Sequence, residues 1–240
     1  MPTNSVLVRG ENITMRFGGI LALSNVDFEV RPREIVGLIG PNGSGKTTMF
    51  NVLTGVLTPT DGYVTIMGNN VTRWPPHRIA RLGVGRTFQI PSPFAKATVL
   101  ENMMVAATGS KARSLERAHA LLDTFDLQHR DEPAELLDSG HLRLLELARM
   151  LMLDPQVILL DEPTSGVDPT LLDELLGHVR AINAEGRAIC VVAHDMQAIE
   201  GLCERVVVLD EGQVIAQGTY EEIRRDPVVV DAYLGTATHS

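Results

Sequence analysis

The stretch Gly40-Pro41-Asn42-Gly43-Ser44-Gly45-Lys46-Thr47 decides which fold this sequence adopts. It matches the pattern G-x-x-x-x-G-K-S/T, with a short apolar strand predicted at 34–39 before it and a helix predicted at 47–57 after it. In such a loop the backbone N–H groups turn toward phosphate oxygens, and the helix N-terminus adds a partial positive charge. An ordinary glycine-rich turn is the alternative, but the strand, the helix and the Lys-Thr pair together favour a phosphate-binding loop.

The residues at the end of this loop have individual predicted roles. Lys46 is expected to reach the β- and γ-phosphates of a nucleoside triphosphate, and the Thr47 hydroxyl to ligate magnesium. Thr48 is a further candidate for a phosphate contact. The loop therefore predicts a nucleotide site, with ATP and Mg²⁺ as the expected ligands.

The composition is that of an α/β protein with a full apolar core. Of the 240 residues, 44% are apolar and 21% are charged, which fits one large domain or a core with one inserted subdomain. The net charge of -9 argues against a general nucleic-acid binder, so no nucleic-acid partner is expected. No apolar run is long enough to cross a membrane, and residues 1–9 lack the pattern of a secretory signal.

The two cysteines, Cys190 and Cys203, both lie in apolar segments. We interpret them as buried free thiols in a reducing compartment rather than as a disulfide. This interpretation predicts a cytosolic location.

The predicted elements change character along the chain. The N-terminal part has the pattern of strands, at 6–9, 13–17, 23–30 and 63–67. The middle has the pattern of helices, at 99–107, 113–125 and 142–152. The last part alternates strands at 157–160, 188–193 and 206–209 with helices at 170–184 and 196–203.

This order predicts an α/β fold with a P-loop core of mostly parallel sheet, an N-terminal antiparallel β part and an inserted helical subdomain. We assign the catalytic core to 1–90 and 153–240, with a short C-terminal element at 218–240, and the helical subdomain to 91–152. Ligands of such a sheet bind at the carboxyl ends of its strands.

An acidic pair, Asp161-Glu162, follows the apolar strand at 157–160. Asp161 is placed to hold, through water, the magnesium that Thr47 ligates from the other side, and Glu162 to act as the general base on the attacking water. Solvated loop charges are the alternative. The phosphate loop in the same chain favours the catalytic interpretation.

Two further polar residues follow predicted strands. Gln89 comes where a strand leaves the sheet for the helical insert, and its amide can sense the metal or the attacking water. His194 follows the strand at 188–193 at the edge from which it can reach a γ-phosphate. A lone glutamine is usually a surface residue and a lone histidine usually structural, but the strand-end position favours function for His194.

In the order of these motifs, and over essentially the whole chain, the sequence resembles the ATP-binding subunits of ABC transporters. The resemblance implies that Phe17 stacks on adenine, Gln89 is the glutamine of the family's Q-loop, Glu162 is the catalytic base and His194 is the switch histidine. It also implies that Asp168 belongs to a loop that contacts a second subunit across a dimer interface.

Finer features resemble one branch of this family. The stretches 86–91 (Arg-Thr-Phe-Gln-Ile-Pro) and 98–102 (Thr-Val-Leu-Glu-Asn) are similar to the ATPases of branched-chain amino acid importers. The tail from Asp226 is similar to the C-terminal element of the same group. ATPases of lipopolysaccharide export systems share such a tail, so an exporter stays open as an alternative.

The sequence departs from the family at the signature that contacts ATP on the partner subunit. Leu137-Asp138-Ser139-Gly140-His141 stands where the family has Leu-Ser-x-Gly-Gln, so Asp138 replaces the serine. Two unit charges about 4 Å apart repel by about 4 kcal/mol at an effective dielectric near 20. A small shift that lets Ser139 take the role is the alternative.

The resemblance implies a set of partners and a location. We expect a second, non-identical ATPase subunit, because Asp138 weakens one of two sites, and permease subunits that span the membrane. A solute-binding protein is an indirect partner. The expected location is the cytoplasmic face of the membrane. Weak-turnover ATP binding, and a soluble ATPase of DNA repair or translation, are the competing functions.

Overall fold

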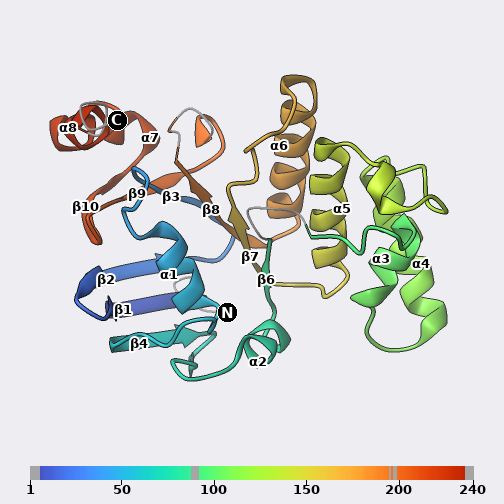
Figure 1. The fold of residues 1–240 in the computed structure, drawn as a ribbon, viewed down its shortest axis with the longest axis horizontal. Helices are drawn as coiled ribbons and strands as arrows, with labels where there is room; N and C mark the ends of the chain where they lie inside the picture. The colour runs from blue at the N-terminus through green and yellow to red at the C-terminus, as the bar shows by residue number, and fades with distance from the viewer. Residues whose placement is uncertain (1–5, 88–91, 195, 197–198, 236–240) are drawn as a thin grey trace.

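Two β-sheets form the frame of the protein in the computed structural model, which describes residues 6–87, 92–194, 196 and 199–235 (Figure 1). Within these ranges one sheet has the strand order β2-β1-β4-β5 and the other has the order β10-β9-β3-β8-β7-β6. The first sheet contains β1 (Val8–Phe17), β2 (Ile20–Val30), β4 (Asp61–Ile66) and β5 (Asn69–Asn70). The second contains β3 (Ile35–Ile39), β6 (Val84–Arg86), β7 (Val157–Asp161), β8 (Ala188–Ala193), β9 (Arg205–Asp210) and β10 (Gln213–Gly218).

The strand pairing confirms the predicted α/β class. β6, β7, β8, β3 and β9 pair in parallel, and β10 joins β9 at the edge in the antiparallel sense. The N-terminal sheet is antiparallel in each of its described pairs. A parallel sheet covered on both faces needs continuous apolar runs, and this is why β7 and β8 show no polar alternation.

Helices lie between the sheets and on the outer face of the larger one (Figure 1). α1 (Lys46–Leu53) shares one apolar cluster with both sheets. The others are α2 (Pro76–Arg81), α3 (Val99–Val105), α4 (Lys111–Thr124), α5 (Ser139–Leu151), α6 (Pro169–Ala184), α7 (Tyr220–Ile223) and α8 (Pro227–Gly235), with a 3-10 turn, η1, at Ala134–Leu136. Within the described ranges, no helix is both long enough and apolar enough to cross a bilayer.

The side chains of β3 alternate between two apolar cores. Ile35 and Ile39 belong to the core shared with α4, α5 and α6, whereas Val36 and Leu38 belong to the core shared with α1 and the N-terminal sheet. β7 and β8 divide their side chains between the two cores in the same way. Burial on both faces fixes the strands, so the residues at their carboxyl ends have defined positions.

The helix predicted at 47–57 is too long at its C-terminal end. α1 stops at Leu53, and Thr54 is its C-terminal cap. Gly55 takes a left-handed φ of 71°, and a Cβ there would lie 2.3 Å from the carbonyl oxygen of Trp74. The close approach of the chain at Trp74 therefore ends the helix where a glycine allows the turn.

The remaining differences from the predicted elements come from short or irregular segments. The strands predicted at 6–9 and 13–17 are one strand, β1, which changes register near Asn12. The predicted elements also omit β5, α2, β10, α7 and α8. Of these, α2 and β10 are six residues long, with one buried residue in α2 and none in β10, so neither shows a clear apolar face. The helix predicted at 196–203 lies partly outside the described residues.

α3, α4 and α5 lie together at the end of the molecule opposite the N-terminal sheet (Figure 1). α3 begins with a capping box, in which Thr98 accepts from the backbone of Glu101 and Glu101 from the backbone of Thr98. We propose that this group of helices is the inserted subdomain at 91–152, and that 1–90 and 153–240 form the core.

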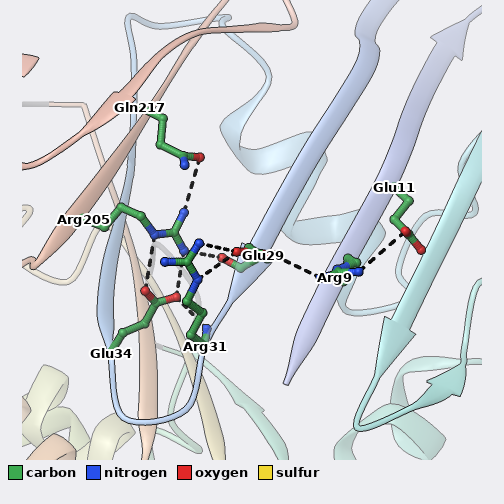
Figure 2. Close-up of polar contacts among 7 residues, drawn as sticks. All are labelled: Arg9, Glu11, Glu29, Arg31, Glu34, Arg205 and Gln217. Atoms are coloured by element: carbon green, nitrogen blue, oxygen red, sulfur yellow. Dashed lines mark hydrogen bonds and ion pairs between the residues drawn. The ribbon is translucent and has the colours of Figure 1, made fainter. Parts of the chain in front are cut away.

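A network of charged side chains joins the two sheets at the amino ends of β3 and β9 (Figure 2). Arg205, at the start of β9, donates to Glu34 Oε1 at 2.7 Å and to the carbonyl oxygen of Glu29 in β2 at 2.7 Å. Glu34 also accepts from the backbone N–H of Arg31. The Arg205 and Glu34 side chains are only 11% and 9% exposed, so each charge depends on the other for compensation.

We expect Arg205→Met to lower the free energy of unfolding by about 3 kcal/mol, because it leaves the buried Glu34 carboxylate without its main partner. Denaturant titration followed by circular dichroism measures the loss. Arg9→Met, which removes a half-exposed pair with Glu29, should cost less than about 1 kcal/mol. Equal losses in the two variants would contradict the role given to burial.

The two cysteines are free, as the sequence predicts. Cys190 is fully buried in β8, and Cys203 is half-buried. Burial raises the pKa of Cys203 to about 12 and raises the pKa of Cys190 well above its ordinary value. Neither thiol therefore forms the reactive thiolate near neutral pH.

We expect the folded protein to resist alkylation by iodoacetamide near neutral pH at both cysteines, and the unfolded protein to be labelled at both. Mass spectrometry of the intact chain counts the labels. Fast labelling of Cys190 before unfolding would show that the core around β8 opens more easily than its burial implies.

Candidate nucleotide site

The loop at 40–47 runs from the end of β3 to the first turn of α1. Gly45 has a φ of 106°, and a Cβ on it would lie 2.8 Å from the carbonyl oxygen of Ala22 in β2. A Cβ on Gly43, whose φ is 83°, would meet no atom within 4 Å. The loop is thus held against β2 at Gly45 and is open at Gly43, which is the shape that a phosphate group requires.

Lys46 crosses this loop with its side chain. Its Nζ donates to the carbonyl oxygens of Gly40 at 2.7 Å and Pro41 at 2.8 Å, and the residue is only 6% exposed. Burial lowers the pKa of Lys46, and the negative charges of Glu162 and Asp161 act in the opposite direction. The ammonium group is therefore bonded to the loop and also stabilised by the charges at the end of β7.

The other loop residues differ in their exposure. Gly40, Pro41 and Ser44 are buried, whereas Asn42 and Gly43 are exposed. Thr47 is exposed at the start of α1, and Thr48 is half-buried. The Thr47 hydroxyl is therefore accessible to a ligand held by the loop.

β7 ends in the predicted acidic pair. Asp161 is its last residue and is 3% exposed. Glu162 has a φ of 47°, an uncommon conformation for a residue with a Cβ, and its backbone N–H donates to the carbonyl oxygen of Val192 in β8 at 3.0 Å. Backbone strain of this kind is concentrated at functional sites.

His194 meets Glu162 at the same edge of the sheet. It follows β8, the parallel neighbour of β7, and its Nδ1 lies 3.4 Å from Glu162 Oε1. The His194 side chain is 52% exposed, whereas that of Glu162 is 14% exposed. The contact therefore joins a sheltered carboxylate to a ring that solvent or a ligand can reach.

Two arginines near the acidic pair are not predicted from the sequence pattern. Arg86 Nη2 donates to Asp161 Oδ2 at 2.9 Å. Arg143, in α5, lies 3.7 Å from Glu146; burial lowers its pKa, while Glu146, Asp161 and Glu162 act in the opposite direction. The position of Arg86, a charged residue at the end of a short apolar strand, could have indicated a role in the site. The sequence of α5 contains no comparable indication for Arg143.

The signature residues lie at the start of α5. Asp138 caps this helix, with Oδ1 accepting from the backbone of His141 at 2.9 Å and Oδ2 lying 2.7 Å from His141 Nδ1. The backbone bond from His141 is the largest effect that lowers the pKa of Asp138. Ser139 Oγ donates to the carbonyl oxygen of Gly166 at 3.1 Å. Gly140 is buried, and a Cβ there would lie 2.3 Å from Leu171.

Phe17 ends β1 in the hairpin whose second strand passes Gly45, and it is 45% exposed. Its ring is thus partly accessible to a ligand. Gln89 lies outside the described residues. Among the described residues, no hydrogen bond or ion pair joins Asp138, Ser139 or Gly140 to the loop at 40–48.

The expected magnesium ligands fit the ion by their chemistry. A threonine hydroxyl and one carboxylate are hard oxygen donors, and Mg²⁺ usually keeps water and phosphate oxygens as its other ligands. The described residues contain no cluster of three or more His, Cys, Asp or Glu side chains suited to a metal. Thr47 and Asp161 would therefore hold the ion together with the nucleotide rather than alone.

The phosphate loop follows β3, His194 follows the neighbouring strand β8, and the Asp161-Glu162 pair lies at the end of β7, the next strand of the sheet. This arrangement defines a P-loop nucleoside triphosphatase. The family described as ABC transporter matches residues 23–165, and the family described as branched-chain amino acid ATP-binding cassette transporter matches residues 213–239. The chain belongs to the ABC transporter family.

Curated relatives match nearly the whole chain. The high-affinity branched-chain amino acid transport ATP-binding protein LivG of Salmonella typhimurium is 41% identical, over 96% of this chain and 98% of the relative. LivG of Escherichia coli is 40% identical over the same shares. BraF of Pseudomonas aeruginosa, named for the same transport, is 36% identical over 94% of this chain and 96% of its own.

Solved structures agree in fold. A nucleotide-free ATP-binding cassette from an ABC transporter superposes with a TM-score of 0.88 at 32% identity, over 95% of this chain and 99% of that one. The ADP conformation of such a cassette also has a TM-score of 0.88 at 32% identity, over 97% and 100% of the two chains. The chain is an ATP-hydrolysing subunit of a transporter.

Proposed function

We propose that this ATPase drives an importer of branched-chain amino acids, with ATP and Mg²⁺ bound at the loop 40–47. The observation that carries the assignment of the site is the convergence of Lys46, Asp161, Glu162 and His194 at one edge of the sheet. The match of residues 213–239 to the branched-chain amino acid family supports the importer over a lipopolysaccharide exporter.

The proposed chemistry divides the site into a holding part and a reacting part. Backbone N–H groups of the loop and Lys46 hold the phosphates, Thr47 and Asp161 hold the ion, and Phe17 stacks on the base. A bound Mg²⁺ neutralises charge that develops on the phosphate oxygens. Gln89 is proposed to sense the ion or the attacking water.

Glu162 is proposed to accept the proton of the attacking water, and His194 to orient that carboxylate and contact the γ-phosphate. The 3.4 Å contact between the two side chains supports this pairing. The Glu162 side chain is only 14% exposed, which supports its assignment to the enclosed part of the site.

The transport role needs a surface for a membrane subunit. A mostly apolar cavity of about 250 Å³ lies between α2, β6 and α5, lined by Val56, Ile79, Ala106, Met150 and Leu153. Arg149 also lines the cavity and donates to the carbonyl oxygen of Ser92. We assign this cavity to a helix of a permease subunit, together with the face around 89–97, of which 89–91 lie outside the described residues. The chain would then act at the cytoplasmic face of the membrane, and a solute-binding protein would act only indirectly.

The second half of each ATP site is proposed to come from a second, non-identical ATPase subunit. Asp138 and Ser139 make their described bonds within α5 and to the loop at Gly166, so they are available to a partner's nucleotide rather than to their own. The Asp138 carboxylate keeps its charge because its pKa is lowered. It therefore repels a partner's γ-phosphate and leaves that site weak.

We expect Glu162→Gln to lower the rate of ATP hydrolysis by about 100-fold or more while ATP still binds, because the proton acceptor is lost and the holding residues are not. Phosphate release and binding of a fluorescent ATP analogue measure the two effects. Glu174→Gln is the matched control, since Glu174 also contacts a histidine, His178, at 3.6 Å in α6. An unchanged rate in Glu162→Gln would exclude this residue as the base.

We expect the purified chain to hydrolyse ATP slowly and Asp138→Ser to raise the rate by about tenfold, which corresponds to about 1.4 kcal/mol of removed repulsion. Serine also caps helices, so this variant removes the charge and keeps the cap. Asp138→Ala removes both and should lose about 1 kcal/mol of helix stability. A full transporter-like rate for the unaltered chain, with no gain in Asp138→Ser, would refute the weak-site proposal.

A further inference from the structure

Arg86 is the last residue of β6, the strand that pairs with β7 at the edge of the larger sheet. Its side chain is 10% exposed and reaches three acceptors at once. Nη2 donates to Asp161 Oδ2 at 2.9 Å, and Nη1 donates to Asn51 Oδ1 at 2.7 Å and to Thr54 Oγ1 at 3.1 Å. The guanidinium also lies over the ring of Phe50.

These acceptors belong to two different elements of the nucleotide site. Asn51 and Thr54 are in or directly after α1, the helix whose first turn carries Thr47. Asp161 ends β7. Thr47 and Asn51 are four residues apart on one helix and so lie on the same face, one turn from each other. The bonds of Arg86 therefore connect the helix that carries one predicted magnesium ligand with the strand that carries the other.

We infer that Arg86 is a positioning residue for the metal: it braces Asp161 against α1 and so sets the separation that the ion must span between Asp161 and Thr47. The inference rests on the proposed assignment of these two residues to magnesium. Arg86 takes one carboxylate oxygen of Asp161, which leaves the other for water around the ion. Mutation of a residue that orients a metal ligand in this way commonly lowers metal affinity by about 10- to 100-fold.

The neighbouring contacts support a brace at this strand end. The Asp161 backbone N–H donates to Thr87 Oγ1 at 3.3 Å, and the Thr87 N–H donates to the carbonyl oxygen of Leu159 at 3.0 Å. Arg86 and Thr87 thus hold the side chain and the backbone of the same residue. A planar guanidinium can bind three acceptors with fixed directions, whereas a lysine ammonium acts as a point charge.

If Arg86 acted only through its charge, its removal would change the metal affinity in the opposite direction. A positive guanidinium beside Asp161 repels a positive ion, so removal of a mere counter-ion would strengthen metal binding. Removal of a brace would weaken it, because Asp161 loses its fixed orientation. The sign of the change therefore distinguishes the two roles.

The test measures the affinity of the full-length chain for a fluorescent ATP analogue, once in Mg²⁺ and once in EDTA. The ratio of the affinity in Mg²⁺ to the affinity in EDTA is the gain due to the metal. We expect Arg86→Met to lower this gain by about tenfold or more and to leave the affinity in EDTA nearly unchanged. Asn51→Ala keeps the charge and removes the shorter of the two bonds from Arg86 to α1 and its C-terminal cap, so it should lower the gain in the same direction. Arg86→Lys should not restore it.

Arg205→Met is the matched control. Arg205 and Arg86 both form buried pairs with a carboxylate at strand ends of the same sheet. Arg205, however, lies at the amino end of β9, whereas the loop follows the carboxyl end of its parallel neighbour β3. Arg205→Met should therefore be less stable to heat yet keep the gain due to the metal. Thermal melts of each variant show that it is folded at the temperature of the binding measurement.

An unchanged or larger gain in Arg86→Met overturns the inference, as does a full gain in Asn51→Ala or in Arg86→Lys. Asp161→Asn separates this failure from failure of the proposed site. If Asp161→Asn abolishes the gain and Arg86→Met does not alter it, Asp161 holds the metal without the brace. If Asp161→Asn keeps the full gain, the metal assignment itself is wrong and the role of Arg86 falls with it.

Discussion

The parallel pairing of β3, β8 and β7 is the constraint on which the rest of the structure depends. Strands that run in the same direction end at the same edge, so the phosphate loop, His194 and the Asp161-Glu162 pair meet there although they are far apart in the chain. Apolar cores on both faces of the sheet hold these ends in place. Hydrolysis requires that positional accuracy, because a base and a bound phosphate must stand within hydrogen-bond reach of one water.

The apolar interior of the sheet confines its charges to the strand ends. At the amino ends, Arg205 and Glu34 close the junction with the N-terminal sheet. At the carboxyl ends, Arg86 and Asp161 form a pair of similar burial. Both pairs compensate charges that would be costly to bury alone. The two pairs have different roles: the described partners of Glu34 are structural, whereas Asp161 is also a proposed metal ligand.

The packing of α5 separates the two halves of the chemistry within one chain. The start of this helix is held by its own Asp138 cap and by the bond from Ser139 to Gly166. Its described bonds do not reach the loop at 40–48, which is consistent with the proposal that a partner supplies the signature to this loop. In that proposal, the charged Asp138 carboxylate, whose pKa is lowered, makes the contribution of this chain to the partner's site an unfavourable one.

Much of the core and of the site could be predicted from the sequence by itself. The phosphate loop between a strand and a helix, the apolar runs of β7 and β8 and the acidic pair after β7 follow from local patterns. A fixed glycine-lysine motif marks the loop, and short continuous apolar runs bounded by turns mark the buried strands. The same patterns failed for α2 and β10, which are too short and too exposed to show a period. They also failed at the end of α1, which depends on the approach of Trp74 to Gly55.

Only the tertiary structure decided which side chains meet. The 3.4 Å contact of Glu162 with His194, the bonds of Arg86 to Asp161, Asn51 and Thr54, and the bonds of Arg205 to Glu34 and Glu29 all join residues from different elements. Sequence spacing determines the face of a helix or strand on which a side chain lies. It does not determine partners across a sheet, because strand order and register are set by the packing of the whole core.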